Sequence, residues 1–201
     1  MRILHSMDEF DQPGCVAVLG TFDGVHLGHA RLIREAAALA RAWRLPAVAL
    51  TFDRHPLALI RPEAVPPPLT TRAERAALLE RLGVDILIEE PFTAEFAAQP
   101  PEDYLATIAG RLRPRAIVAG FNHSYGRGGR GDAALLRALG PRLGYQPVIV
   151  APVCVDGEPV SSTRIRALLR QGRRSEAEAL AGHPLNVEKQ QGDCAESKSM
   201  L

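Results

Sequence analysis

The stretch from Gly20 to His29, which reads GTFDGVHLGH, constrains the fold more than any other part of the chain. The apolar run from Cys15 to Leu19 precedes it and is typical of a buried parallel strand. After it, apolar residues recur three and four positions apart from Leu32 to Ala40, which predicts a helix. The stretch is therefore predicted to be the turn of a strand–turn–helix unit, with two histidines where the helix begins.

This turn has the features of a phosphate-binding site. Unpaired backbone N–H groups and the positive end of the helix dipole attract anions to a helix N-terminus. Gly20 and Gly24 allow the backbone to turn tightly and to approach a ligand. His26 and His29 place two imidazole donors on the first helical turn, and Gly28 between them leaves room for a nucleotide. Such donors stabilise the charge that builds on a phosphoryl group during transfer.

The alternative for the two histidines is a metal pair. Protein metal sites are completed by further His, Cys or carboxylate ligands. No Cys or carboxylate cluster stands near His26 and His29 in the sequence. We therefore favour phosphate chemistry and predict no protein metal site.

A second glycine-rich stretch runs from Gly120 to Asp132, after a predicted strand. Its glycines and arginines can place backbone N–H and guanidinium groups around phosphate oxygens. Asn122 lies at the end of the strand, and Gly126 and Arg127 follow it. We expect the glycines and arginines of this stretch to surround phosphate oxygens; the alternative is a flexible turn without a ligand.

A third candidate is the predicted helix that begins at Ser161 and Ser162, which are good N-cap residues. Thr163 and Arg166 are three positions apart and share one face of this helix. Hydroxyl groups at a helix start bind phosphate oxygens, and a guanidinium group neutralises their charge. An amphipathic helix with surface arginines would look similar, but the histidine motif favours the phosphate site.

The order of the predicted elements indicates an α/β fold. Strands alternate with helical patterns, which predicts a Rossmann-like parallel sheet with helices on both faces. The proline-rich residues 56–70 are predicted to form a surface loop without regular helix or strand. The predicted strands cover residues 15–19, 47–52, 84–88, 116–119 and 146–151.

The sequence resembles the adenylyltransferase domain of prokaryotic FAD synthetases, which belong to the HxGH nucleotidyltransferase superfamily. Four motifs carry the resemblance, and they occur in the family's order: Gly20–His29, Thr51–Pro56, Gly120–Gly126 and Ser161–Arg166. One departure is His123, which stands where the family often has an aromatic residue.

The resemblance implies that AMP is transferred from ATP to FMN, giving FAD and pyrophosphate, with Mg²⁺ accompanying ATP. No general base is required, because the FMN phosphate is already anionic at neutral pH. The residues expected to act in catalysis are His26, His29, Asn122, Ser162, Thr163 and Arg166. The residues expected to border the bound nucleotides are Gly20, Phe22, Asp23, Gly28, Phe52, His55, Gly126 and Arg127.

Two other functions are compatible with the same motifs. A related HxGH enzyme would transfer a nucleotidyl group to another acceptor, such as pantetheine phosphate or nicotinate mononucleotide. A catalytically silent module would bind flavin nucleotide without turnover. The Thr51–Pro56 motif favours FMN as the acceptor, and the intact His26, His29, Thr163 and Arg166 favour catalysis.

Length and composition favour one domain without a membrane or nucleic-acid partner. Apolar residues make up 46% of the 201 residues, which suffices for a core, and the net charge is only +1. We expect an adenylyltransferase domain over residues 1–185 and a disordered tail over 186–201, too short for the riboflavin kinase domain of the bifunctional enzymes.

The sequence does not indicate the oligomeric state. Three cysteines without CxxC spacing and no signal peptide favour a cytoplasmic protein.

Overall fold

The computed structural model describes residues 1–186, and the predicted tail lies outside this range except for Asn186. The described residues form a parallel sheet of six strands in the order β1-β4-β3-β2-β5-β6 and a separate two-stranded hairpin, β7-β8. The strands are β1 Arg2–Leu4, β2 Cys15–Leu19, β3 Ala47–Phe52, β4 Ile86–Glu90, β5 Pro114–Gly120, β6 Gln146–Val150, β7 Cys154–Val155 and β8 Glu158–Pro159.

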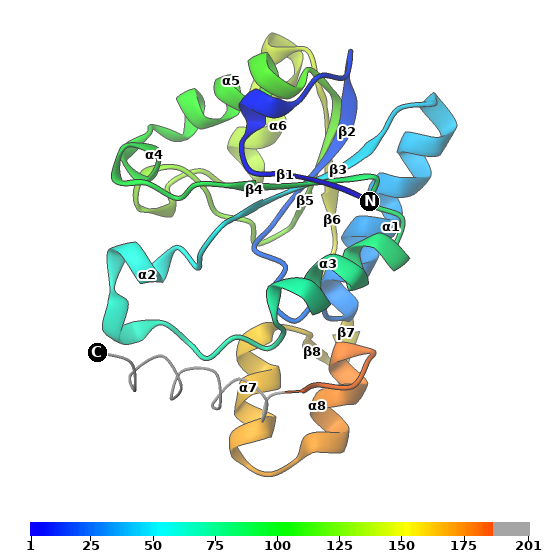
Figure 1. Ribbon diagram of the computed structural model, residues 1–201, viewed down its shortest axis with the longest axis vertical. Coiled ribbons are helices and arrows are strands. Elements are labelled where there is room, and N and C mark those ends of the chain that lie inside the picture. The colour runs from blue at the N-terminus through cyan, green and yellow to red at the C-terminus, as the bar shows by residue number, and fades with distance from the viewer. Residues whose placement is uncertain (187–201) are drawn as a thin grey trace, which may run out of the picture.

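Helices connect the strands and cover both faces of the sheet (Figure 1). The helices are α1 Leu27–Trp43, α2 Leu57–Ile60, α3 Arg72–Arg81, α4 Ala94–Ala98, α5 Pro101–Leu112, α6 Ala133–Leu143, α7 Ser162–Arg170 and α8 Arg174–Ala181, with short 3₁₀ turns at Met7–Glu9, Pro62–Ala64 and Arg127–Gly129.

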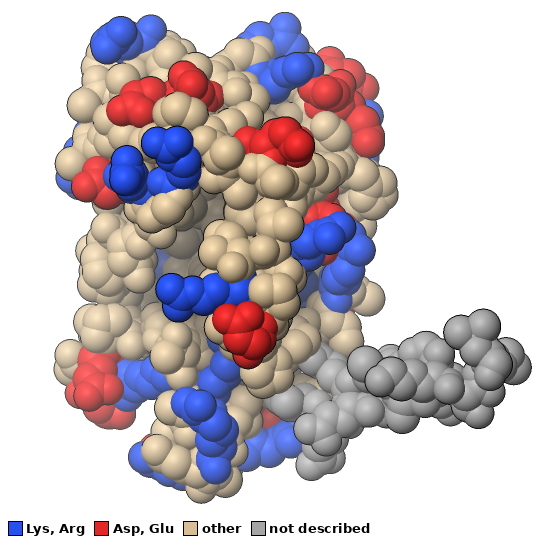
Figure 2. Space-filling model, turned by 90° about the vertical axis from the view of Figure 1, so that its left-hand side faces the viewer, with Lys and Arg blue, Asp and Glu red and all other residues tan. Residues whose placement is uncertain are grey.

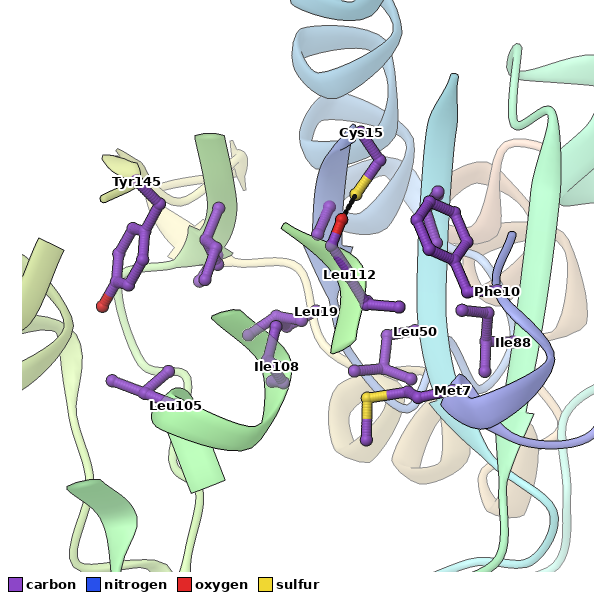
Figure 3. Close-up of a cluster of buried hydrophobic side chains, with 14 of the residues drawn as sticks. Met7, Phe10, Cys15, Leu19, Leu50, Ile88, Leu105, Ile108, Leu112 and Tyr145 are labelled. Carbon is purple, nitrogen blue, oxygen red and sulfur yellow. Dashed lines mark hydrogen bonds between the residues drawn. The ribbon is translucent and has the colours of Figure 1, made fainter. Parts of the chain in front are cut away.

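The two faces of the sheet bury two separate hydrophobic clusters. One cluster joins strand residues to α5 and α6, and the other joins them to α1 and α3. Figure 3 shows part of the first, in which Leu105 and Ile108 of α5 lie near Leu19 of β2. The thiol of Cys15 also donates a hydrogen bond to the carbonyl oxygen of Leu112 (Figure 3). These layers fix the carboxyl ends of the strands, where ligands bind in open α/β sheets.

Helices α7 and α8 form a pair outside these two layers, below the sheet in Figure 1. Their own hydrophobic cluster contains Ile165, Leu168 and Leu180, together with Leu69 from the proline-rich loop. No residue of the six strands belongs to this cluster. The position of α7 against the sheet therefore depends on loops and polar contacts.

The predicted α/β class and the parallel, Rossmann-like sheet are confirmed. Two local signals are also confirmed: Thr71 and Glu74 form a capping box before α3, and Asp156 and Gly157 form the turn of the β7–β8 hairpin. Both depend on residues that are close in sequence, which explains why the sequence predicts them.

The structure differs from the predicted elements at three points. Strand β1 was missed because it has only three residues, two of them exposed, and so shows no apolar run. Strand β4 begins two residues later than predicted, at Ile86. The proline-rich loop contains the short helix α2, because Leu57–Ile60 lies between two prolines and is itself free of them.

None of the described helices is long and apolar enough to cross a membrane.

Candidate active site

A cavity of about 540 Å³ lies at the carboxyl ends of the central strands. It is lined by residues at or after the ends of β2, β3, β5 and β6, among them Gly20, Phe52, Gly120 and Val150. Helices α2 and α4, which lie at the left of Figure 1, also contribute lining residues. Figure 2 views the molecule from that side and shows a hollowed face with basic side chains around the hollow.

The turn between β2 and α1 has an unusual backbone. Phe22 and Val25 have positive φ angles of 50° and 37°, which bulky and β-branched residues rarely adopt. Both side chains are buried, and this packing holds the turn in its conformation. Gly24 has a φ of 79°, and a Cβ atom there would lie 2.8 Å from the side chain of Leu69. The turn is thus fixed by the core beneath it.

This turn places the two histidines against each other. His26 is the N-cap of α1, and its Nδ1 atom accepts a hydrogen bond from the backbone N–H of His29 at 3.3 Å. The two rings stack with centroids 3.7 Å apart and planes 16° apart. The edge of the Phe22 ring contacts His29, with centroids 5.5 Å apart. Both histidines line the cavity, as predicted.

Gly28 has a second role beside the predicted one, because it also makes room for the His26 ring. A Cβ atom at this position would lie 3.0 Å from Cε1 and 3.1 Å from Nδ1 of His26. The glycine therefore makes room for the imidazole ring as well as lining the cavity.

Burial keeps both imidazoles neutral at pH 7. Loss of hydration lowers the pKa of His26 from 6.5 to about 4, although the nearby Asp23 carboxylate opposes the shift. Burial also lowers the pKa of His29 well below its ordinary value, and the charge of a protonated His26 would lower it further. Each neutral ring carries one N–H donor, and the Nδ1 atom of His29 has no hydrogen-bond partner among the described residues.

This shift makes the stability of the fold depend on pH. In the unfolded chain His26 takes up a proton below about pH 6.5, whereas in the folded chain it does so only near pH 4. Stability is therefore lost as the pH falls through this range, by about 3 kcal/mol from this residue. We expect His26→Asn, which keeps an N-cap side chain but does not titrate, to flatten the dependence. Urea unfolding of both proteins between pH 7 and pH 4 measures the difference, and parallel curves would contradict the assigned pKa.

The N-terminus of α7 opens into the same cavity. Ser161 is the N-cap, and its hydroxyl oxygen accepts a hydrogen bond from the backbone N–H of Arg164 at 3.2 Å. Ser162 and Thr163 follow and line the cavity. The Ser162 hydroxyl donates to the carbonyl oxygen of Asp23 at 2.8 Å, so its proton is already engaged. The histidines and these residues therefore face one cavity, although they lie on different helices.

Arg166 does not line this cavity. Its guanidinium group forms an ion pair with Asp23, and its Nε–H donates to the carbonyl oxygen of Pro67 at 2.8 Å. Asp23 itself lines a second cavity of about 380 Å³, between the end of β3 and the proline-rich loop. Contact of Arg166 with phosphate stays a prediction.

Other predicted residues are divided between the two cavities. Gly20, Asn122 and Gly126 line the larger cavity, and Phe52 lines both. His55 lines only the smaller one, where its Nδ1 atom accepts a hydrogen bond from the backbone N–H of Leu57.

Besides Arg166, two predicted residues line neither cavity. The side chain of Phe22 is fully buried beneath the turn, so it supports His29 from the core. Arg127 is exposed to solvent beside the larger cavity, whose lining includes its neighbours Gly126 and Gly128.

Aromatic side chains line one side of the larger cavity, and the sequence pointed to Phe52 and His123 but not to Phe96, Tyr104 or Tyr125. The Phe52 ring contacts Phe96, with centroids 5.5 Å apart, and Phe96 contacts Tyr104 at 5.7 Å. Tyr104 stacks with Tyr125 at 5.3 Å, and Tyr125 stacks with His123 at 5.6 Å. All five line the cavity. These residues lie far apart in the chain, so their spacing gave no sign that they form one wall.

His123 is the last member of this row of rings. Burial lowers its pKa to about 4, so the ring is neutral at pH 7. Its Nε2 atom is buried without a hydrogen-bond partner among the described residues. The neutral imidazole stacks on Tyr125 and leaves this unpaired ring nitrogen beside the cavity.

Among residues 1–186 no group of three or more His, Cys, Asp or Glu side chains is arranged to hold a metal ion.

Comparisons with known proteins show the family of this chain. A family model described as FAD synthetase matches residues 8–164. The chain is 31% identical over 188 residues to the bifunctional riboflavin kinase/FMN adenylyltransferase of Escherichia coli (strain K12). This match covers 93% of this chain and 60% of that protein. It is 35% identical over 175 residues to a Listeria monocytogenes protein named FAD synthetase, covering 87% of this chain and 71% of that protein.

One solved structure shares both fold and sequence. It is described as a macrolide-efflux protein from Streptococcus pneumoniae, and it superposes with a TM-score of 0.79 at 32% identity. The match covers 91% of this chain and 60% of that chain. The chain thus spans about 60% of the length of the E. coli relative and of the S. pneumoniae chain.

Proposed function

Because the chain belongs to the FAD synthetase family, we propose that it is an FMN adenylyltransferase. It transfers AMP from ATP to FMN, and the products are FAD and pyrophosphate. The observation that carries the proposal is the larger cavity, into which His26, His29, Ser162 and Thr163 all open. The family match over residues 8–164 includes every one of these residues.

The chemistry that follows is an in-line displacement at the α-phosphorus of ATP. An oxygen of the FMN phosphate forms the new bond, and the bond to pyrophosphate breaks. Positioning and charge stabilisation suffice for such a step. The neutral rings of His26 and His29 offer N–H donors to the charge that builds on the α-phosphate, in a site from which much water is excluded.

The start of α7 holds the leaving group in this proposal. Ser162 and Thr163, at this helix start, line the cavity. The unpaired backbone N–H groups of a helix start favour an anion there. Asn122, from the end of β5, orients the nucleotide. Arg166 contacts phosphate only if its guanidinium N–H groups reach past Asp23, so we assign it a weaker part in this step.

Mg²⁺ enters with ATP in this proposal. When bound, it would neutralise charge on the phosphate oxygens, and Mg²⁺ in nucleotide sites needs few direct protein ligands. The donor set fits this mode, because Asp23, the acidic residue of the turn, is already paired with Arg166.

The aromatic side chains on one side of the larger cavity support FMN as the acceptor over pantetheine phosphate. A tricyclic flavin ring offers a large flat surface, and aromatic side chains stack or pack edge-on against such surfaces. Phe52, Phe96, Tyr104 and Tyr125 provide this surface close to the histidine pair. Pantetheine phosphate has no ring to use it.

A cytoplasmic location is part of the proposal. Cys15 and Cys154 are both free thiols, and burial raises the pKa of the Cys15 thiol to about 12, which keeps it unreactive. We also propose that residues 1–185 form one adenylyltransferase domain.

Incubation of the purified protein with FMN, ATP and Mg²⁺ tests the function directly. We expect FAD and an equal amount of pyrophosphate, measured by chromatography and by a coupled pyrophosphate assay. Riboflavin in place of FMN is the control and should give no FMN. Turnover with pantetheine phosphate or nicotinate mononucleotide but not with FMN would replace the acceptor, and FMN binding without pyrophosphate release would identify a binding module.

A further inference from the structure

Asp23 is the residue through which the two phosphate-facing helix starts are joined. Its Oδ1 atom accepts a hydrogen bond from the backbone N–H of Leu69 at 2.9 Å. Its Oδ2 atom pairs with Nη2 of Arg166 on α7, and its carbonyl oxygen accepts the Ser162 hydroxyl. One residue of the β2–α1 turn thus contacts the proline-rich loop and the first turns of α7.

The pair formed by Asp23 and Arg166 is well shielded from solvent. The two side chains are only 14% and 13% exposed. The Nε–H of Arg166 is held by the carbonyl oxygen of Pro67, which fixes the plane of the guanidinium group. Charged hydrogen bonds between partly buried groups are stronger than those at the surface, so this pair restrains the two helices firmly.

Few other contacts fix α7 against the sheet. Its hydrophobic cluster contains loop and helix residues and no residue of strands β1–β6. Leu27, the first residue of α1, packs on the edge of this cluster, and His183 lies 2.8 Å from the carbonyl oxygen of Gly24. The pair of Asp23 with Arg166 is the ionic contact that links the turn of α1 to α7.

The relative position of the two helix starts matters for the proposed reaction, on which this inference rests. His26 and His29 act at the α-phosphate, while Thr163 and the N-terminus of α7 hold the pyrophosphate. A displacement of about 1 Å between such groups can lower a rate on the order of a hundredfold. We propose that Asp23 is a positioning residue, which acts through Arg166 to hold α7 in register with the histidine pair.

The Asp23→Asn variant separates this role from that of the loop contact. Its amide oxygen can still accept the Leu69 N–H, but it has no charge to pair with Arg166. We expect kcat for FAD formation to fall by about tenfold, with the KM for FMN changed by less than about twofold. Steady-state kinetics with each substrate varied in turn measure both.

A double-mutant cycle with Arg166→Gln tests whether Asp23 acts through Arg166. If it does, adding Asp23→Asn to Arg166→Gln lowers kcat no further, within about twofold. If the two losses multiply, Asp23 acts independently and the proposal is overturned. Wild-type kcat in Asp23→Asn overturns it as well.

Asp85→Asn is the matched control, because Asp85 also accepts a backbone N–H, from Ala47 at 2.8 Å, and lines neither cavity. It should lose some thermal stability and keep the wild-type kcat. If Asp23→Asn does not fold, Arg166→Gln alone takes its place, and wild-type kcat in that variant overturns the proposal. A wild-type protein that makes no FAD would instead refute the proposed function itself.

Discussion

Replacing His29 by Ala is expected to lower kcat for FAD formation by about a hundredfold while the protein stays folded. In acyl-transfer enzymes, removal of one preorganised hydrogen-bond donor to the developing charge lowers kcat by a factor of about 10²–10³. His29 lines the cavity, stacks on His26, and carries a neutral ring at pH 7 because burial lowers its pKa. Loss of the ring removes a donor and leaves a gap beside His26 and Phe22.

Turnover and folding must be measured together for this variant. Circular dichroism and thermal unfolding report the fold, and FAD formation at saturating ATP and FMN reports kcat. His5→Ala is the control, because His5 is exposed and lines neither cavity, and it should behave as the wild-type protein does. Wild-type turnover in His29→Ala would remove this residue from the mechanism.

Phe22→Ala is expected to be the most destabilising single change in the site, by about 3–5 kcal/mol. The side chain is fully buried in the cluster under α1. It also holds the turn at a positive φ and contacts the ring of His29. Activity should fall too, because the histidine loses its support.

Urea unfolding at pH 7 measures this loss, and Phe121→Ala is the matched control. Phe121 is 46% exposed and lines the cavity, so its truncation should change stability by less than about 0.5 kcal/mol. A loss below about 1 kcal/mol for Phe22→Ala, together with weaker FMN binding, would instead support Phe22 as a nucleotide contact, as the sequence had suggested.

Much of this molecule follows from patterns that are local in the chain. The alternation of apolar runs with helical periods predicts an α/β fold, and the run Cys15–Leu19 before GTFDGVHLGH places the histidines at a helix start. The Thr71–Glu74 capping box and the Asp156-Gly157 hairpin depend on residues a few positions apart. Such features need no tertiary contact to be recognised.

Other features were decided by the tertiary structure. Strand β1 forms because β4 offers it a hydrogen-bonding edge, and its three residues show no pattern of their own. Phe52, Phe96, Tyr104 and Tyr125 make one wall only because β3, α4, α5 and the loop after β5 meet at one end of the sheet. Sequence spacing carries no information about such a meeting.

The same limit explains which motif residues face the cavity. The first motif contains Phe22, Asp23 and the two histidines, and the last contains Arg166. Neither motif indicates the direction in which a side chain points. The positive φ of Phe22 turns its ring into the core, and the charge of Asp23 draws Arg166 away from the larger cavity. The sequence determined the fold and the chemical groups of the site. Backbone strain and charge pairing, which exist only in the tertiary structure, decided which of these groups face the cavity.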